Sequence, residues 1–155
     1  MEVKGLMIDP SSNNPIVILR DPESQAFLPI WIGLFEASAI QLGLESVASP
    51  RPRTHDLLAS LVRTLGSEVV KVVVADLRDQ TFYAVIHVRR GGEELEIDAR
   101  PSDAIALALR TGSPVFVARA VLEKAQVGGA TQDEQERLRK LLEEIDPEDL
   151  GEYEM

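Results

Sequence analysis

Residues 81–99 read TFYAVIHVRRGGEELEIDA, and their pattern organises the chain around them. Two runs of alternating apolar and polar residues flank Gly91 and Gly92, a pair that favours a two-residue hairpin turn. A turn of that length pairs Arg90 with Glu93, and every later pair follows from it. The resulting apolar face contains Ala84, Ile86, Val88, Leu95, Ile97 and Ala99. The sequence therefore predicts an antiparallel hairpin with one face turned toward the core.

The other face of this hairpin is polar, which supports the same register. It places His87 opposite Glu96 and Tyr83 opposite Arg100. Cross-strand pairing with a carboxylate is enough to explain His87. We therefore interpret this histidine as structural rather than catalytic.

Turn residues and apolar periodicity divide the rest of the chain into further elements. Before the hairpin we expect strands over residues 3–9, 15–20, 26–32 and 69–77, and helices over 34–46 and 55–65. After it we expect helices over 103–110 and 120–125, a strand over 114–118, and an acidic helix over 131–145. Thr54 and Ser102 are predicted to cap the helices that follow them. This order predicts one α+β domain over residues 1–127, with a mostly antiparallel or mixed sheet, and an acidic C-terminal helix or tail over 128–155.

The composition bounds the class of protein. The chain has 155 residues, of which 45% are hydrophobic and 27% charged, which suits one domain with a core that needs no disulfides. Cysteine is absent, which excludes thiol catalysis and Cys-ligated zinc. No apolar run reaches the ~20 residues of a membrane helix, and no signal-peptide pattern opens the chain. We therefore expect a cytoplasmic protein with no membrane partner.

The negative charge is concentrated at the C-terminal end. The formal net charge is −10, and residues 131–155 hold 10 acidic and 3 basic side chains of the total. No basic stripe of the kind that nucleic-acid-binding proteins carry is present. Any nucleic-acid function must therefore use a small local site.

Glu36 is a carboxylate in an apolar setting. On a helical wheel it lies among Phe35, Ala39, Ile40 and Gly43, away from the polar face. A carboxylate there should be paired with a cation or held ready for chemistry. Both interpretations stay open from the sequence.

Residues 51–56 read RPRTHD and place two guanidinium groups before the start of a helix. Arg51 and the hydroxyl of Thr54 suit the binding of a phosphate there. His55 can act as an acid, a base or a metal ligand, and Asp56 lies on the polar helix face. The alternative is a capped helix with a surface ion pair.

Residues 98–103 read DARPSD and repeat the pattern of an Arg-Pro pair before a hydroxyl residue and a helix. Asp98 and Arg100 project from one face of the strand. Asp103 and Arg110 share the polar edge of a helix that is otherwise apolar and should be buried. These charges suit either a site or an internal ion-pair lock.

Trp31 is the chain's one tryptophan, and its apolar neighbours favour a place in the core or in an interface over a base-stacking role. Motifs of dinucleotide binding, phosphate loops, zinc proteases and α/β-hydrolases are absent from the sequence.

Three blocks of this sequence resemble the bifunctional nuclease family. They are LPIWIG at 28–33 with the Glu36 segment, RPRTHDLL at 51–58, and DARPSDAIALA at 98–108. The resemblance runs from about residue 2 to residue 127. It implies an α+β domain of a kind that usually self-associates, and an activity, reported for some members, that cleaves both DNA and RNA. For this chain we expect a homo-oligomer, with a dimer as the first expectation, and cleavage of DNA, RNA or both.

The resemblance and the residue patterns select the same side chains. The candidate catalytic residues are Glu36, His55, Asp56, Asp98 and Asp103. The candidate phosphate-binding residues are Arg51, Thr54, Arg100 and Ser102. Carboxylates among Glu36, Asp56, Asp98 and Asp103 are candidate ligands for Mg²⁺ or Mn²⁺, which would activate water while His55 transfers the proton. This hypothesis requires the two Arg-Pro corners to meet in space.

A different class of function stays open. The acidic balance and the missing basic stripe favour a non-catalytic oligomeric module that binds an anion, a nucleotide or a protein. In that case the charges are salt bridges, dry and fully paired, whereas a catalytic site should open to solvent with an unpaired pair of carboxylates. A regulator whose acidic tail covers a basic face is the third possibility.

Overall fold

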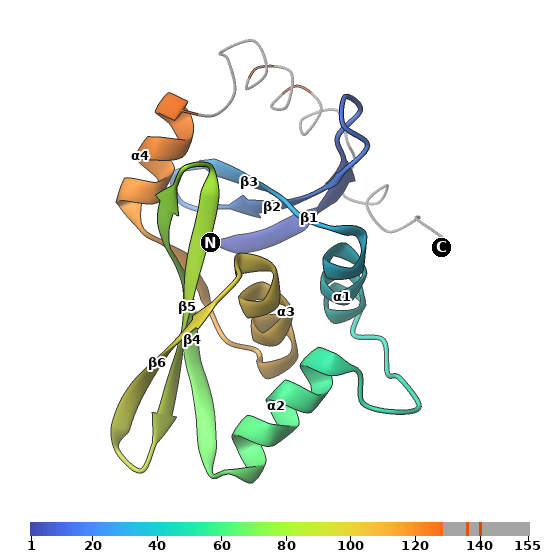
Figure 1. The fold of residues 1–155 in the computed structure, drawn as a ribbon, viewed down its shortest axis with the longest axis vertical. Coiled ribbons are helices and arrows are strands. Elements are labelled where there is room, and N and C mark those ends of the chain that lie inside the picture. The colour runs from blue at the N-terminus through green and yellow to red at the C-terminus, as the bar shows by residue number, and fades with distance from the viewer. Residues whose placement is uncertain (129–135, 137–139, 141–155) are drawn as a thin grey trace.

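The computed structural model describes residues 1–128 together with Glu136 and Lys140 (Figure 1). The first three strands form an antiparallel sheet in chain order, and they are β1 (Glu2–Ile8), β2 (Pro15–Arg20) and β3 (Phe27–Trp31). The middle strand β2 is buried over its first five residues. The predicted meander is confirmed, and it makes a sheet of its own rather than part of a single large one.

The second sheet is built around the predicted hairpin. Its strands are β4 (Ser67–Arg78), β5 (Thr81–Arg90), β6 (Glu93–Ala99) and β7 (Val115–Val117), in the order β6-β5-β4-β7. The β5–β6 register runs from Arg90 opposite Glu93 to Ala84 opposite Ala99, as the two-residue turn predicts. β7 pairs with β4 in parallel, so this sheet is mixed.

The helices of the described region are α1 (Leu34–Leu44), α2 (Thr54–Thr64), α3 (Pro101–Thr111) and α4 (Arg119–Gly128). Figure 1 shows α3 at the centre, where it contacts α1, α2 and the strands β4 and β5. Its residues from Ala104 to Ala108 are all buried, which confirms the prediction from its apolar composition. The small alanines allow close approach to neighbours on several sides at once.

One hydrophobic core joins the two sheets. Leu19 and Ile30 of the first sheet belong to the same buried cluster as Ile40 of α1, Val74 of β4 and Ile105 of α3. The predicted single α+β domain is therefore confirmed. No helix in the described part of the chain is long and apolar enough to cross a membrane.

Two predicted helix caps are wrong by one or two residues. Arg53 and Arg100 occupy the N-cap positions, and Thr54 and Ser102 lie inside the first turns. At α2 the Asp56 carboxylate accepts a hydrogen bond from the Arg53 backbone N–H at 2.9 Å, which is the half of a capping box that the third helical residue supplies. At α3 the fixed φ of proline favours a helix that begins at Pro101.

The apolar face of the hairpin is only partly covered. Ile86 and Val88 on β5 are buried, whereas Leu95 and Ile97 on the edge strand β6 are nearly half exposed. Apart from Glu136 and Lys140, the predicted acidic helix over 131–145 lies outside the described residues, and the boundary at residue 127 stays a prediction.

Candidate functional site

Arg100 connects the starts of two helices. Its Nη1 donates to Oε1 of Glu36 at 2.9 Å, and its Nε donates to Oδ2 of Asp103 at 2.9 Å. Glu36 lies in the first turn of α1, and Asp103 lies in the first turn of α3. The guanidinium bridges them while 64% of the Arg100 side chain remains exposed.

His55 brings the third helix into this group. Its Nε2 lies 3.0 Å from Oδ1 of Asp103, so the two oxygens of that carboxylate face a histidine and an arginine. His55 stands in the first turn of α2, and only 12% of its side chain is exposed. We call these four residues, Glu36, His55, Arg100 and Asp103, the Arg100 cluster. The helix starts that follow the two Arg-Pro pairs therefore meet at His55 and Asp103, and a site shared by Arg51 and Arg100 stays a prediction.

The position of Glu36 depends on the glycine before its helix. A Cβ added to Gly33 would lie 2.2 Å from Oε2 of Glu36, closer than atoms can pack. The hydrogen bond from the backbone N–H of Glu36, then that from Arg100, hold the pKa of the Glu36 carboxyl below its ordinary value. Glu36 is therefore a fixed carboxylate rather than a free one.

Two opposing effects act on Asp103. Burial raises the pKa of its carboxyl, but the hydrogen bonds from Arg100 and His55 outweigh burial and hold that pKa below its ordinary value. Asp103 is thus an anion with both oxygens engaged. A carboxylate in this position fixes the tautomer and the orientation of a histidine ring.

Asp56, the neighbour of His55, belongs to a separate ion pair. Arg110 Nε donates to Oδ1 of Asp56 at 2.8 Å, and the other Arg110 nitrogens donate to the backbone carbonyls of Ala106 and Ala39. The Arg110 side chain is only 10% exposed. These contacts tie α1, α2 and α3 together, so Asp56 and Arg110 form an internal ion-pair lock. The sequence instead places the possible lock among the charges of residues 98–103 and Arg110, and predicts a surface ion pair at Asp56.

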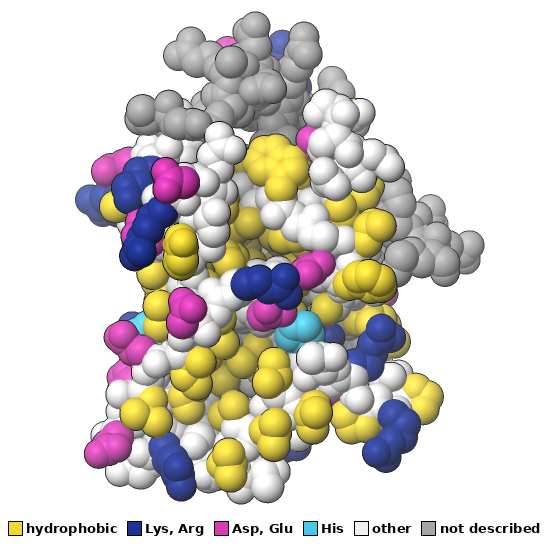
Figure 2. Space-filling model, viewed as in Figure 1, with side chains coloured by type: hydrophobic (Ala, Val, Ile, Leu, Met, Phe, Trp, Pro, Cys, Tyr) yellow, Lys and Arg dark blue, Asp and Glu magenta, His cyan; other side chains and the backbone are white. Residues whose placement is uncertain are grey.

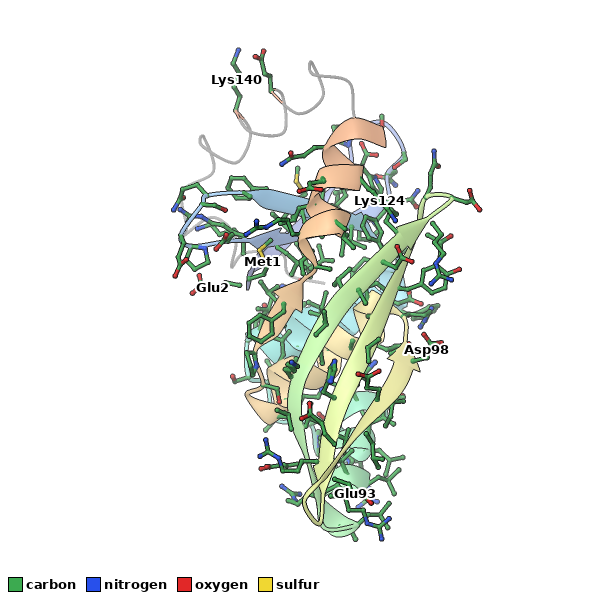
Figure 3. The ribbon with its side chains drawn as sticks, turned by 90° about the vertical axis from the view of Figure 1, so that its left-hand side faces the viewer. Met1, Glu2, Glu93, Asp98, Lys124 and Lys140 are labelled. Atoms are coloured by element: carbon green, nitrogen blue, oxygen red, sulfur yellow. The ribbon has the colours of Figure 1, made fainter. Side chains whose placement is uncertain are left out.

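The remaining candidates stand apart from the Arg100 cluster. Asp98 is exposed on β6, and Figure 3 shows it at the outer edge of the hairpin. Arg51 is exposed in the loop before α2, and Thr54 is exposed at the first position of that helix. Ser102 is buried behind Arg100 and lines the cavity described next. Thr54 and Ser102 are not N-caps, and their predicted role in phosphate binding stays a prediction.

A cavity of about 480 Å³ opens beside the cluster, between the first sheet and the turn from β4 to β5. Glu36 and Arg100 line one end, and Trp31 lines the wall contributed by β3. Figure 2 shows this face hollowed between a large apolar side chain above and paired basic and acidic side chains below.

The sequence predicts that Trp31 lies in the core or in an interface. It is 50% exposed, so the core alternative is wrong and the interface alternative stays a prediction. The alternation along β3 carries the signal: Leu28 and Ile30 are buried, which places Trp31 on the opposite face of the strand.

The charges of the Arg100 cluster match in full neither the predicted catalytic site, which should be open with unpaired carboxylates, nor the predicted set of dry, fully paired salt bridges. The site is open to solvent, as a catalytic site should be, but both carboxylates are paired with Arg100. Within the described residues, no three side chains of His, Asp or Glu come together as metal ligands.

Comparison with known proteins identifies relatives of the whole chain. A family model described as the bifunctional nuclease domain matches residues 17–129. An uncharacterized protein of Mycobacterium tuberculosis is 36% identical over 161 residues, which cover 97% of this chain and 96% of that protein.

Plant relatives are more distant and longer. Bifunctional nuclease 1 of Oryza sativa subsp. japonica is 25% identical over 116 residues, which cover 73% of this chain and 35% of that protein. Bifunctional nuclease 2 of Arabidopsis thaliana is 25% identical over 108 residues, covering 68% of this chain and 33% of that protein. The chain thus spans about a third of the length of these plant proteins.

Proposed function

The chain belongs to the bifunctional nuclease domain family, and from that premise we propose that it hydrolyses phosphodiester bonds in DNA, RNA or both. The observation that carries the proposal is the Arg100 cluster. It combines a histidine oriented by a carboxylate with an exposed guanidinium at the mouth of a cavity. Proton transfer and neutralisation of phosphate are the two requirements of this chemistry.

Arg100 is the proposed phosphate ligand. A guanidinium has five N–H donors, and the contacts with Glu36 and Asp103 engage Nε and Nη1. The Nη2 end is then directed to substrate, where it can donate to phosphate oxygens. Glu36 and Asp103 hold the guanidinium in one orientation, so the Arg100 side chain loses little conformational entropy when substrate binds.

His55 is the proposed proton-transfer residue. With Nε2 toward the Asp103 anion, that nitrogen carries the proton and Nδ1 keeps a lone pair. In the proposed step a water oxygen attacks phosphorus and Nδ1 accepts a proton from that water. The bond between phosphorus and the ester oxygen breaks, and the leaving oxygen takes a proton from solvent water to become the alcohol. Asp103 stabilises the imidazolium that forms.

Mg²⁺ or Mn²⁺ is the proposed cofactor, held jointly by protein and substrate. Mg²⁺ commonly binds one or two carboxylates together with substrate phosphates and retains several waters. Glu36 and Asp103 are the carboxylates that the cluster offers for this purpose. The metal would supply Lewis-acid neutralisation of the phosphate.

The alternative function is a non-catalytic module that binds an anion or a nucleotide. It is favoured by one specific observation, that both carboxylates of the cluster are already paired with Arg100. In this case the cluster recognises phosphate without cleaving it. Binding in EDTA with no cleavage in Mg²⁺ or Mn²⁺ would support this alternative over the nuclease.

We also propose that the protein is a homodimer that forms through α2 and β6. Exposed leucines and isoleucine line these elements, namely Leu57, Leu58, Leu61, Leu65, Leu95 and Ile97. Figure 2 shows hydrophobic side chains spread over the lower half of this face, where Figure 1 places α2 and β6. Apolar patches of this kind are typical of protein interfaces.

The test of nuclease function compares cleavage of labelled single- and double-stranded DNA and RNA in Mg²⁺, Mn²⁺ or EDTA. The wild type is run beside Asp103→Asn, which removes the anion that orients His55. Glu68→Gln is the matched control, because it removes one charge from the exposed Arg89–Glu68 pair. We expect EDTA-sensitive cleavage in the wild type and the control, and its loss in folded Asp103→Asn. Equal cleavage in all three proteins would overturn the assignment of the site.

The melting temperature gives a second test of the metal. Since the described residues contain no preformed cluster of three ligands, Mg²⁺ alone should leave the melting temperature unchanged. Mg²⁺ together with a non-hydrolysable phosphorothioate oligonucleotide should raise it, by mass action on the folded state. A rise with Mg²⁺ alone would contradict joint binding.

A further inference from the structure

The cavity beside the Arg100 cluster has an apolar part and a polar part. Ile30, Ile32 and Phe82 contribute apolar walls, and the polar side chains of Asn14, Gln80 and Thr81 also line it. Its volume of about 480 Å³ lies within the range of small-molecule sites. One end is therefore cationic, through Arg100, and the walls toward β3 are aromatic and apolar.

Trp31 is held in place although half of it faces solvent. Its ring N–H donates to Oδ2 of Asp9 at 3.1 Å. Hydrogen bonds from the Ser12 hydroxyl, the Ser11 backbone N–H and Trp31 itself hold the pKa of the Asp9 carboxyl far below its ordinary range. The Asp9 carboxylate is therefore an anion that holds the N–H edge of the Trp31 indole in place. Half of the Trp31 side chain remains exposed to solvent.

An exposed aromatic ring and a guanidinium in one cavity match the two parts of a nucleotide. Bases stack on aromatic side chains whatever their sequence, because every base has a flat π face. Phosphate oxygens accept hydrogen bonds from guanidinium groups. The polar side chains on the walls can meet the donors and acceptors at the edge of a base.

We propose that this cavity binds one unpaired nucleotide of a single-stranded nucleic acid, with its base stacked on Trp31 and its phosphate at Arg100. The proposal rests on the proposed function in taking Arg100 as the phosphate ligand. It adds the substrate class, because a base inside a duplex is already stacked on both faces and must leave the helix to reach Trp31.

The overall charge points to the same substrate class. Duplex binding relies on many phosphate contacts along a basic surface. This chain carries a net charge of −10 and no basic stripe. Stacking on one aromatic ring and one phosphate contact make a small site that does not need such a surface.

The sole tryptophan of the chain makes this proposal directly measurable. The full chain is titrated in EDTA with a thymidine 12-mer, and with the same strand annealed to its complement, while Trp31 fluorescence is recorded. We expect saturable quenching by the single strand and at least tenfold weaker quenching by the duplex. Equal quenching by both would overturn the choice of single strands.

Substitutions of Trp31 test whether its aromatic ring stacks on a base or only supplies apolar surface to the cavity. Anisotropy of a fluorescein-labelled 12-mer should give affinities in the order wild type, Trp31→Phe, Trp31→Leu, with the last roughly tenfold to hundredfold weaker. Phe116→Leu is the matched control, since Phe116 is 47% exposed on β7 and does not line the cavity. Melting curves confirm that each variant folds. Equal affinity of Trp31→Leu and wild type would overturn the proposal.

Different results would overturn the proposed nuclease function and the proposed nucleotide site at Trp31. Quenching by the single strand without any cleavage would overturn the nuclease and leave the nucleotide site supported. Cleavage without quenching would overturn the Trp31 site and leave the nuclease supported.

Discussion

His55 and Asp103 are 48 positions apart in the chain, yet Nε2 of the histidine lies 3.0 Å from Oδ1 of the carboxylate. Their contact joins the first turns of α2 and α3. The second oxygen of Asp103 accepts from Arg100, which in turn reaches Glu36 on α1. The starts of three helices therefore converge, α1 and α3 on the Arg100 guanidinium and α2 on Asp103, and this convergence defines the candidate site.

Gly33→Ala should reduce nuclease activity without unfolding the protein. Gly33 has φ −82°, which alanine adopts readily, so the backbone should tolerate the change. The added methyl group would meet Oε2 of Glu36 and push that carboxylate away from Arg100. We expect cleavage to fall about tenfold, as in Glu36→Gln, with little change in the melting temperature. Full activity in Gly33→Ala would show that the position of Glu36 is unimportant.

Arg110→Met should destabilise the fold rather than alter the chemistry. Arg110 is buried and holds Asp56 together with two backbone carbonyls, and all of these would lose a charged donor. We expect the free energy of unfolding in urea to fall by about 2–3 kcal/mol. Arg63→Met, on an exposed position of α2, is the control and should change stability by less than about 0.5 kcal/mol. Equal stability of the two variants would show that the lock is not needed.

The sequence predicts the members of the site better than their pairing. The hairpin register follows from one local turn and from strand alternation, and the seven pairs from Ala84–Ala99 to Arg90–Glu93 agree with it. The predicted pair of Tyr83 with Arg100 is wrong, because β6 ends at Ala99 and Arg100 begins α3 as its N-cap. His55 and Asp56 are neighbours in sequence, but the helix turns them to different partners, Asp103 and Arg110. Which partner each finds depends on how α2 packs against α3, and no local pattern encodes that packing.

Burial is the other quantity that local patterns leave open. Alternation correctly groups Leu95 and Ile97 with the apolar face of the hairpin, but their exposure depends on what covers the edge strand. Trp31 is similar, because its apolar neighbours suggest the core although the strand turns it outward. The exposure of these side chains depends on how the two sheets are arranged, and that arrangement is set by contacts between residues distant in the sequence.

Acid should destabilise the protein partly through Asp103. Its folded-state pKa lies below the ordinary value of 3.8, so the carboxylate stabilises the fold above that pH and loses this contribution as the pH falls through the folded value. We expect the free energy of unfolding to decline below about pH 4. The decline should be shallower in Asp103→Asn, with the remainder due to Glu36 and Asp56, whose pKa values are also lowered.

Urea titrations of the two proteins at several pH values measure this difference. Glu68→Gln serves as the control, and its pH dependence should follow that of the wild type. Identical slopes for the wild type and Asp103→Asn would mean that Asp103 titrates at its ordinary pKa in the folded protein, contrary to the contacts with Arg100 and His55.

Leu61→Lys should convert the proposed dimer into monomers. Leu61 is 48% exposed on α2, between Leu57 and Leu65 on the same helical face. A lysine there would place a charge in the apolar centre of the interface, where desolvation is costly. Sedimentation velocity at micromolar concentrations measures the mass. Leu44→Lys, on an exposed position of α1, should remain dimeric. A monomeric wild type, or a dimeric Leu61→Lys, would rule out the interface at α2 and β6.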